Sequence, residues 1–203
     1  AMVTGADDGG SSGLLRNYIN IVPPGDIRNI LVAMSHVDPK ITQVMQYRFD
    51  AKDDFFAKHA VGNLIIAAMT EMHGNIFDAV QHLARFMNVR GRIYPVSNEP
   101  LVLHAEFKNG DIIAGEAEIT HAHKIIDHVW VTGDEPGEEP KAAPEVVEAI
   151  IGADMIVYGP GSLFTSILPN VVVPEVNAAL RITKAKQVYI SNIMTQKGET
   201  DAY

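Results

Sequence analysis

The chain of 203 residues contains no cysteine, only one tryptophan, and fewer basic than acidic side chains. The absence of cysteine excludes disulfides, thiolate catalysis and cysteine-ligated zinc, and it is typical of a cytoplasmic protein. No apolar run reaches the length of a membrane-spanning helix, and we recognise no signal peptide. We therefore expect a soluble cytoplasmic protein with no membrane partner.

The charge balance also argues against one class of partner. Sixteen Lys and Arg residues stand against 25 Asp and Glu residues, which gives a net charge of -9. A nucleic-acid backbone would be repelled unless a basic patch existed, and the sequence shows none, so we expect no nucleic-acid partner. With 47% hydrophobic residues, the length suits one main α/β domain. Both ends look cut, and we expect the domain to be incomplete.

A glycine-rich loop in the second half is the strongest local signal. Met155-Ile156-Val157-Tyr158 reads as a short buried strand, and Gly159-Pro160-Gly161 then forces a turn. Ser162, Thr165 and Ser166 follow, at the end of a strand where ligands bind in open α/β sheets. The spacing matches neither a dinucleotide fingerprint nor a Walker loop. On its own, this stretch is more typical of a structural turn that joins a core strand to the next element.

A second loop of the same character lies near the first residues. Met2-Val3-Thr4 reads as a strand, and Gly5 to Gly13 then combine the adjacent carboxylates Asp7 and Asp8 with glycines and hydroxyls. A phosphate would be repelled by these carboxylates unless a magnesium ion bridged it, or unless they faced a sugar or a proton to be moved. The alternative is an Asp/Gly turn with a helix cap.

Helices fill most of the first half. Asp26 is placed to cap a helix through Ile27, Ile30, Leu31 and Met34, and Arg28 and Asn29 fall in its first turn. Arg28 could face an anion there or pair with Asp26 or Asp7. Further helices are expected after Asp38-Pro39, over 64–69 and over 76–87, with His59 just before the second of these. A histidine in such a place is either a ligand or a hydrogen-bonded structural group.

The middle of the chain changes its period to that of strands. Residues 92–96, 101–107, 112–119 and 125–131 read as strands of an antiparallel insertion at about 92–131, with a hairpin turn at Asn109-Gly110. His121 and His123 would share a face of a strand, near His128. A metal site is one explanation and solvated histidines are the other.

The last third returns to an alternation of helix and strand. An acidic linker over 132–144 precedes a helix at 144–151, another helix opens at Pro174, and residues 187–190 form a core strand that ends in a polar loop. The three polar loops would lie along one edge of a parallel sheet. We predict an α/β fold with a mostly parallel sheet.

Five motifs in order resemble a known family. They are Ala6-Asp7-Asp8-Gly9-Gly10-Ser11-Ser12-Gly13, Pro23-Pro24-Gly25-Asp26-Ile27-Arg28-Asn29, Gly62-Asn63-Leu64, Gly159-Pro160-Gly161-Ser162-Leu163-Phe164-Thr165-Ser166, and Asn192-Ile193-Met194-Thr195-Gln196 with Gly198-Glu199-Thr200. Together they are similar to the gluconeogenesis factor family, called YvcK-like. That family is related to 2-phospho-L-lactate transferase, called CofD-like. The resemblance covers nearly all of residues 1–203 as one domain.

The resemblance implies a Rossmann-like α/β fold with helices on both faces of the sheet, a nucleotide or nucleotide-sugar ligand, and two candidate functions. One is a regulatory factor that binds UDP-sugars and supports cell morphogenesis and wall synthesis on gluconeogenic carbon sources. The other is a magnesium-dependent transferase that moves a phospholactyl group from a guanosine diphosphate conjugate to a deazaflavin alcohol. Whether the protein forms a homo-oligomer is left open.

Both functions would use the same residues. Asp7 and Asp8 would be catalytic and hold magnesium only in the enzyme. The ligand-binding set is Gly9, Gly10, Ser11, Ser12, Asp26, Arg28, Asn29, His59, Asn63, Gly159, Gly161, Ser162, Thr165, Ser166, Asn192, Thr195 and Gln196. In this scheme the glycine-rich loops hold the diphosphate, and Arg28 and Asn192 orient it. A dehydrogenase and a serine hydrolase are disfavoured because their fingerprints are missing.

Overall fold

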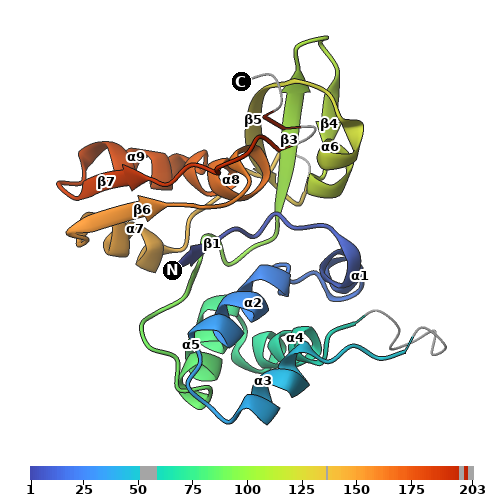
Figure 1. The fold of residues 1–203 in the computed structure, drawn as a ribbon, viewed down its shortest axis with the longest axis vertical. Helices are drawn as coiled ribbons and strands as arrows, with labels where there is room; N and C mark the ends of the chain where they lie inside the picture. The colour runs from blue at the N-terminus through green and yellow to red at the C-terminus, as the bar shows by residue number, and fades with distance from the viewer. Residues whose placement is uncertain (51–58, 136, 197–198, 201–203) are drawn as a thin grey trace. The chain divides into compact units, whose positions relative to one another are not determined.

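The computed structural model describes residues 1–50, 59–135, 137–196 and 199–200. Gly198, part of the last sequence motif, lies outside the described residues. The chain divides into two compact units, Ala1–Pro100 and Leu101–Tyr203, and each is described by itself. Both combine helices and strands, so the fold is mixed α/β (Figure 1). The single-domain organisation remains a prediction.

The first unit is built mainly from helices. In chain order its elements are β1 (Met2–Val3), α1 (Gly10–Ile19), α2 (Gly25–Met34), α3 (Pro39–Gln46), α4 (Val61–His73), α5 (Ile76–Phe86) and β2 (Tyr94–Pro95). β1 and β2 pair in parallel. Their neighbours α2, α4 and α5 bury one apolar cluster that contains Ile27, Leu31, Ile66, Ile76 and Val80. Burying this cluster is the main stabilising contribution to the unit.

Helix α5 illustrates how the sequence determines an element of this unit. Its apolar residues at Ile76, Val80 and Leu83 follow helical spacing and are all buried. Asn75 caps the helix, since its side chain accepts a 2.8 Å hydrogen bond from the backbone N–H of Asp78 and donates another to the Asp78 carboxylate. Such reciprocal capping satisfies N–H groups that the first turn leaves free. The helix predicted over 76–87 is therefore confirmed.

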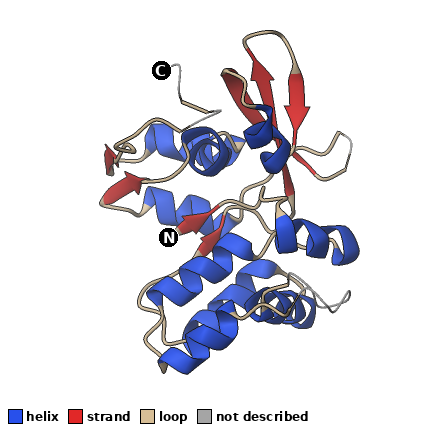
Figure 2. Ribbon diagram, turned by 45° about the vertical axis from the view of Figure 1, so that its right-hand side comes forward, coloured by secondary structure: helices blue, strands red, loops and turns tan. Residues whose placement is uncertain are grey.

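The second unit contains two separate sheets. Its elements are β3 (Leu101–Phe107), β4 (Ile112–Ala114), α6 (Glu116–Ala122), β5 (Ile126–Gly133), α7 (Pro144–Ile151), β6 (Met155–Tyr158), the π-helical turn η1 (Leu163–Ile167), α8 (Leu168–Val171), α9 (Pro174–Ile182) and β7 (Lys186–Tyr189). The first sheet is antiparallel in the order β4-β3-β5, and the second is the parallel pair of β6 and β7. Figure 2 shows the strands among the helices.

The two sheets bury their side chains differently. Along β3 every second residue is buried, and the buried set is Leu101, Leu103, Ala105 and Phe107. This alternation is typical of a sheet with one face against a core. Along β6 and β7, by contrast, no residue is buried, and helices α7 and α9 of the same unit contact each other.

Most elements from residue 92 onward match the prediction, but two segments differ. α7 and β6 have the predicted bounds, but no residue of β6 is buried, so the prediction of a buried strand at Met155–Tyr158 is wrong. Residues 92–96 were predicted within the antiparallel segment, yet β2 pairs in parallel with β1 instead. The strand predicted over 112–119 stops at Ala114, because Gly115 has φ 98° and α6 begins directly after it. Glu116 in the first turn favours that helix.

The histidine pair in this segment is also placed differently. His121 is in the last turn of α6 and His123 is its C-cap residue, so the two do not share a face of a strand. In the part of the chain that the structure describes, no group of three or more His, Cys, Asp or Glu side chains could hold a metal ion. The histidine metal site is therefore not supported.

The helices that the structure describes are short compared with the thickness of a membrane. Over residues 1–50, 59–135, 137–196 and 199–200, no single helix has both the length and the apolar character to span a bilayer. Two consecutive segments, Leu163–Val171 and Pro174–Ile182, meet the requirement only when counted together, and they are bent by 77°.

Candidate functional site

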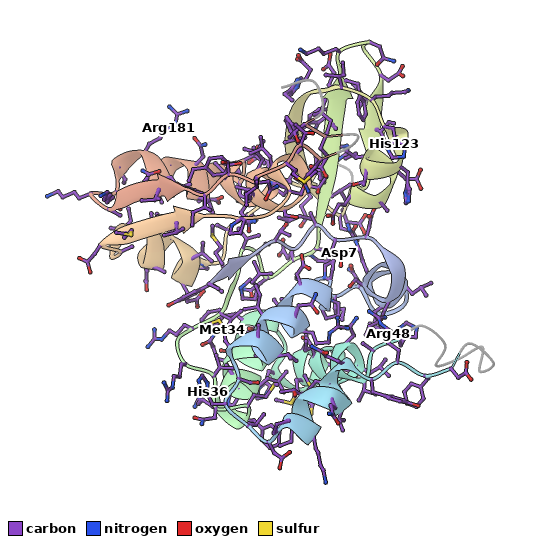
Figure 3. The ribbon with its side chains drawn as sticks, in the orientation of Figure 1. Asp7, Met34, His36, Arg48, His123 and Arg181 are labelled. Atoms are coloured by element: carbon purple, nitrogen blue, oxygen red, sulfur yellow. The ribbon has the colours of Figure 1, made fainter. Side chains whose placement is uncertain are left out.

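The first group of predicted site residues lies where β1 leads into α1. Asp7 lies in this connecting segment (Figure 3), and its Oδ1 accepts a 2.9 Å hydrogen bond from the backbone N–H of Gly9. Gly10 opens α1, and Ser11 and Ser12 follow it as buried residues. The Ser12 hydroxyl accepts a 3.1 Å hydrogen bond from the backbone N–H of Gly25, which opens α2. The first turn of α1, which directly follows the acidic loop, thus contacts the first turn of α2.

A buried chain of hydrogen bonds continues from Ser11. Its hydroxyl lies 3.1 Å from Nδ1 of His59 and accepts a 3.0 Å hydrogen bond from the side-chain amide of Asn63. The Asn63 carbonyl in turn accepts a 3.2 Å hydrogen bond from Nη1 of Arg28. Nη2 of Arg28 donates to the Asn29 side chain at 2.8 Å. Five predicted site residues are therefore brought together, although they come from three separate parts of the sequence.

Arg28 is the unusual member of this chain, because it is a buried cation held by neutral groups. Arg28 is 7% exposed, and its Nε has no hydrogen-bond partner among the described residues. Over the described residues, no carboxylate lies within ion-pair distance of Arg28, so the predicted pairing with Asp26 or Asp7 is not formed. A buried guanidinium without an anion is costly, and an anionic ligand would relieve that cost.

Nearby charges act on Arg28 from a distance. Burial lowers its pKa most, Arg48 lowers it further, and Asp26 and Asp7 act in the opposite direction. For Asp26, burial and then the Asp7 carboxylate raise the pKa, against the influence of Arg28. Asp26 lies in the first turn of α2 and is not its N-cap, which is Pro24, so the predicted capping role is wrong. Its charge instead contributes to the field around Arg28.

Helix α4 comes unusually close to Arg28. A Cβ atom placed on Gly62 would lie 2.9 Å from Cγ and Cδ of Arg28 and 2.6 Å from the backbone oxygen of Met45. Distances this short are not tolerated by any larger side chain. Glycine at this position therefore lets α4 bring Asn63 within reach of the guanidinium.

The adjacent carboxylates of Asp7 and Asp8 are the predicted ligands of a magnesium ion. Asp7 and Asp8 are two carboxylates, and within the described ranges no third side chain completes a metal-binding group. Magnesium often uses one or two carboxylates together with phosphate oxygens and water. The donor set is therefore compatible with a metal that arrives with a phosphate ligand.

The second group of predicted residues lies in the second unit, after β6. The Ser162 hydroxyl caps η1, because it accepts a 3.3 Å hydrogen bond from the backbone N–H of Thr165. The two hydroxyls of Ser162 and Thr165 are 2.6 Å apart. Both also contact the carboxylate of Glu199. The Ser162 hydroxyl donates to Oε2 of Glu199, and the Thr165 hydroxyl donates to Oε1 of Glu199 at 3.3 Å. Glu199 is buried, with 6% of its surface exposed.

The loop that follows β7 is hydrogen-bonded to the loop that follows β6. The Asn192 side-chain amide donates to the backbone oxygen of Gly161 and to the Gln196 side chain, both at 2.9 Å. Gln196 and Thr200 share two hydrogen bonds of 2.8 Å. The backbone N–H of Thr200 donates to the backbone oxygen of Gln196, and the backbone N–H of Gln196 donates to the Thr200 hydroxyl. Parallel pairing of β6 and β7 brings the two loops to one end of the pair. Ser166 continues the turn, whereas Thr195 is exposed and is not drawn into this cluster by any described hydrogen bond.

Glu199 was not among the residues predicted to bind a ligand. It stands in the last motif, but nothing in its sequence neighbourhood indicates that its partners are 34 and 37 residues away. A buried carboxylate beside hydroxyl-bearing residues of a glycine-rich loop is recognisable only from the folded structure.

The comparisons with known proteins agree with the mixed α/β fold. Residues 1–203 match the sequence profile of the family described as 2-phospho-L-lactate transferase CofD. The chain belongs to this CofD family. A crystal structure of a protein from Bacillus halodurans matches all of the chain with a TM-score of 0.94 and 45% sequence identity, and the match covers 64% of that protein's chain.

Curated relatives add a second name. A "Putative gluconeogenesis factor" from Streptococcus pyogenes is 54% identical over 203 residues, which are all of this chain and 62% of that protein. A "Gluconeogenesis factor" from Halalkalibacterium halodurans is 46% identical over 203 residues. The chain therefore spans 62% of the length of these relatives.

Proposed function

We propose that this chain contributes the ligand-binding part of a gluconeogenesis factor that binds a nucleotide sugar of the UDP-sugar type. Its function is regulation by ligand occupancy, in support of cell morphogenesis and wall synthesis on gluconeogenic carbon sources. A Rossmann-like fold with an antiparallel insertion, a cytoplasmic location and the absence of nucleic-acid and membrane partners belong to the same proposal.

The observation that carries the proposal is the environment of Arg28. The guanidinium is buried, and among the residues that the structure describes it is bonded only to the side chains of Asn63 and Asn29, with no partner for its Nε. A diphosphate supplies the negative charge and the acceptor that this group lacks. Hydrogen bonds to charged groups contribute about 1.5–3 kcal/mol each, so one such contact is worth roughly tenfold or more in affinity.

The test is calorimetric titration of the full-length protein with UDP-N-acetylglucosamine, with guanosine diphosphate as the competitor. We expect tight binding of the UDP-sugar, no consumption of it, and at least a tenfold loss of affinity in Arg28→Ala. Arg90→Ala, which removes an exposed cation of the same unit, is the matched control and should bind normally. Normal UDP-sugar affinity in Arg28→Ala would overturn the assignment of the anion to this residue.

A second candidate is a transferase of the 2-phospho-L-lactate type. The adjacent carboxylates Asp7 and Asp8 favour it, because they lie after β1 and within the loop that leads into α1. With a magnesium ion, these residues would hold the metal of a departing diphosphate, or one of them would accept the proton of an attacking hydroxyl.

The variant Asp8→Asn separates the two candidates. A transferase that depends on the carboxylate would lose its magnesium-dependent turnover. A binding protein would keep its ligand affinity or improve it, because one negative charge near the phosphate is removed. Magnesium-dependent binding of guanine nucleotide together with indifference to UDP-N-acetylglucosamine would favour the transferase.

A further inference from the structure

The buried carboxylate of Glu199 determines which atoms the loop at residues 159–166 can offer to a ligand. A hydroxyl has one proton to donate and two lone pairs that accept. The Ser162 hydroxyl donates to Glu199, and the Thr165 hydroxyl lies 2.6 Å from the Ser162 oxygen and 3.3 Å from Glu199, so both protons are used within the cluster. Neither hydroxyl is then free to donate to a phosphate.

The N–H groups of the Asn192 side chain are likewise already used in hydrogen bonds within the protein. The side-chain amide of Asn192 has two N–H groups, which donate to Gly161 and Gln196. Its carbonyl oxygen is an acceptor. The side chains at this loop therefore present oxygen lone pairs, and the carboxylate adds a negative charge.

That charge is not balanced by a described neighbour. Over residues 1–50, 59–135, 137–196 and 199–200, no Lys, Arg or His lies within ion-pair distance of Glu199. A buried carboxylate repels a second anion strongly, because the surroundings screen it poorly. A phosphate placed here would meet repulsion in addition to hydroxyls that already donate elsewhere.

We propose that Glu199 is a specificity-determining residue, which makes the loop at residues 159–166 a site for a hydrogen-bond donor of the ligand, namely a hydroxyl or an amide N–H, and excludes phosphate from it. This inference rests on the proposed function for the identity of the ligand as a nucleotide sugar. Within that ligand, donor groups are present on both the sugar and the base, whereas the diphosphate offers only acceptors.

The experiment is titration of the full-length protein with pyrophosphate, UDP-N-acetylglucosamine and uridine, before and after Glu199→Gln. Glutamine has nearly the same shape, but it is neutral and can accept fewer hydrogen bonds, so a hydroxyl proton is released toward the ligand. We expect pyrophosphate to bind at least tenfold more tightly, and Ser162→Ala added to Glu199→Gln to cancel the gain. Glu148→Gln, an exposed carboxylate of α7, is the charge-matched control and should change nothing.

The titrations with UDP-N-acetylglucosamine and uridine show which part of the ligand donates the hydrogen bond to this loop. A loss of UDP-N-acetylglucosamine affinity in Glu199→Gln with unchanged uridine binding assigns the donor to the sugar, and a parallel loss for uridine assigns it to the base. Unchanged pyrophosphate affinity in a folded Glu199→Gln protein would overturn the inference. If the wild-type protein binds no UDP-sugar, the proposed function fails, while the pyrophosphate arm still decides the role of Glu199.

A second variant covers a failure of Glu199→Gln to fold. Ser162→Ala in the otherwise unchanged protein should leave pyrophosphate affinity within twofold, because its hydroxyl donates to Glu199 and not to an anion. A loss of tenfold or more would show that Ser162 donates to phosphate, and it would overturn the inference.

Discussion

Nη1 of Arg28 donates a 3.2 Å hydrogen bond to the side-chain oxygen of Asn63, which lies 35 residues further along the chain. The donor is a buried cation from α2, and the acceptor is a neutral amide from the first turn of α4. An amide holds the guanidinium in place but leaves its charge uncompensated. Asn63 therefore orients the guanidinium of Arg28 but does not neutralise its charge.

The variants of Asn63 test that separation. Asn63→Ala removes the acceptor of Arg28 and a donor to Ser11, and leaving buried polar groups unpaired costs about 1–3 kcal/mol each. We expect lower thermal stability together with weaker ligand binding. Asn63→Asp keeps the acceptor but adds a charge, so it should retain more stability than Asn63→Ala and still bind the nucleotide sugar at least tenfold less tightly than wild type. Equal affinity in wild type and Asn63→Asp, measured by calorimetry, would contradict this.

Replacing Gly62 by alanine tests the close approach of α4 to Arg28. The added methyl group would lie 2.6 Å from the oxygen of Met45 and 2.9 Å from the Arg28 side chain, so one of them has to move. Overpacking of this kind costs about 1–3 kcal/mol. Gly152→Ala is the control, because its new methyl group would be 3.3 Å from its nearest neighbour. Thermal unfolding of both variants should show a clear loss only for Gly62→Ala.

The raised pKa of Asp26 predicts a pH-dependent gain from Asp26→Asn. Burial and the neighbouring Asp7 disfavour the ionised carboxylate in the folded state and so raise its pKa above the ordinary value of 3.8. The resulting cost is present at neutral pH and disappears as the pH falls through the raised value toward the ordinary one. Asp26→Asn should therefore raise the melting temperature at pH 7, with an advantage that shrinks toward pH 4. A constant difference over this range would exclude titration of Asp26 as its cause.

The fluorescence of Trp130, the only tryptophan of the sequence, can report the protonation of His104. The rings of His104 and Trp130 stack with centroids 5.3 Å apart, and Nε2 of the histidine lies 3.0 Å from the hydroxyl of Thr132. Burial lowers the pKa of His104 below 6.5, so the folded protein disfavours its protonated form. Stability contributed by neutral His104 is then lost as the pH falls below about 6.5.

We expect His104→Gln to reduce the loss of thermal stability between pH 7.5 and 5.5. The tryptophan fluorescence of the wild-type protein should change with a midpoint below 6.5, and the variant should lack that transition. His128 also lies beside Trp130, with centroids 5.4 Å apart, so His128→Gln is the matched control. If His128→Gln removes the transition and His104→Gln retains it, the assignment is wrong.

Local elements were predictable where their signals were local. β6 and α7 have the predicted bounds because an apolar run and a proline mark them directly. The segment after β4 was predicted as a continued strand, and the change at Gly115 was missed because its positive φ is a property of the fold. Helix and strand propensities compete over so few residues, and tertiary packing decides between them.

The candidate site was predictable as a set of residues but not as a set of contacts. Asn63 and Arg28 were both singled out, yet the alternative of a carboxylate partner for Arg28 was equally consistent with the sequence. The role of Glu199 was missed, since its contacts with Ser162 and Thr165 span 37 and 34 residues. Spacing along the chain carries no information about which distant side chains meet. The single-domain organisation and the ligand-binding set remain predictions.

The pairing of β1 with β2 gives the first unit an order of assembly. The amino group of Ala1 donates to the backbone oxygen of Arg92, a separation of 91 residues, while α4 and α5 between them contact each other as chain neighbours. Closing a loop of that length costs on the order of 4 kcal/mol in chain entropy. Helical hairpins form early and distant strands pair late. We therefore expect the Asp7 loop, which follows β1, to be anchored late in the folding of its unit.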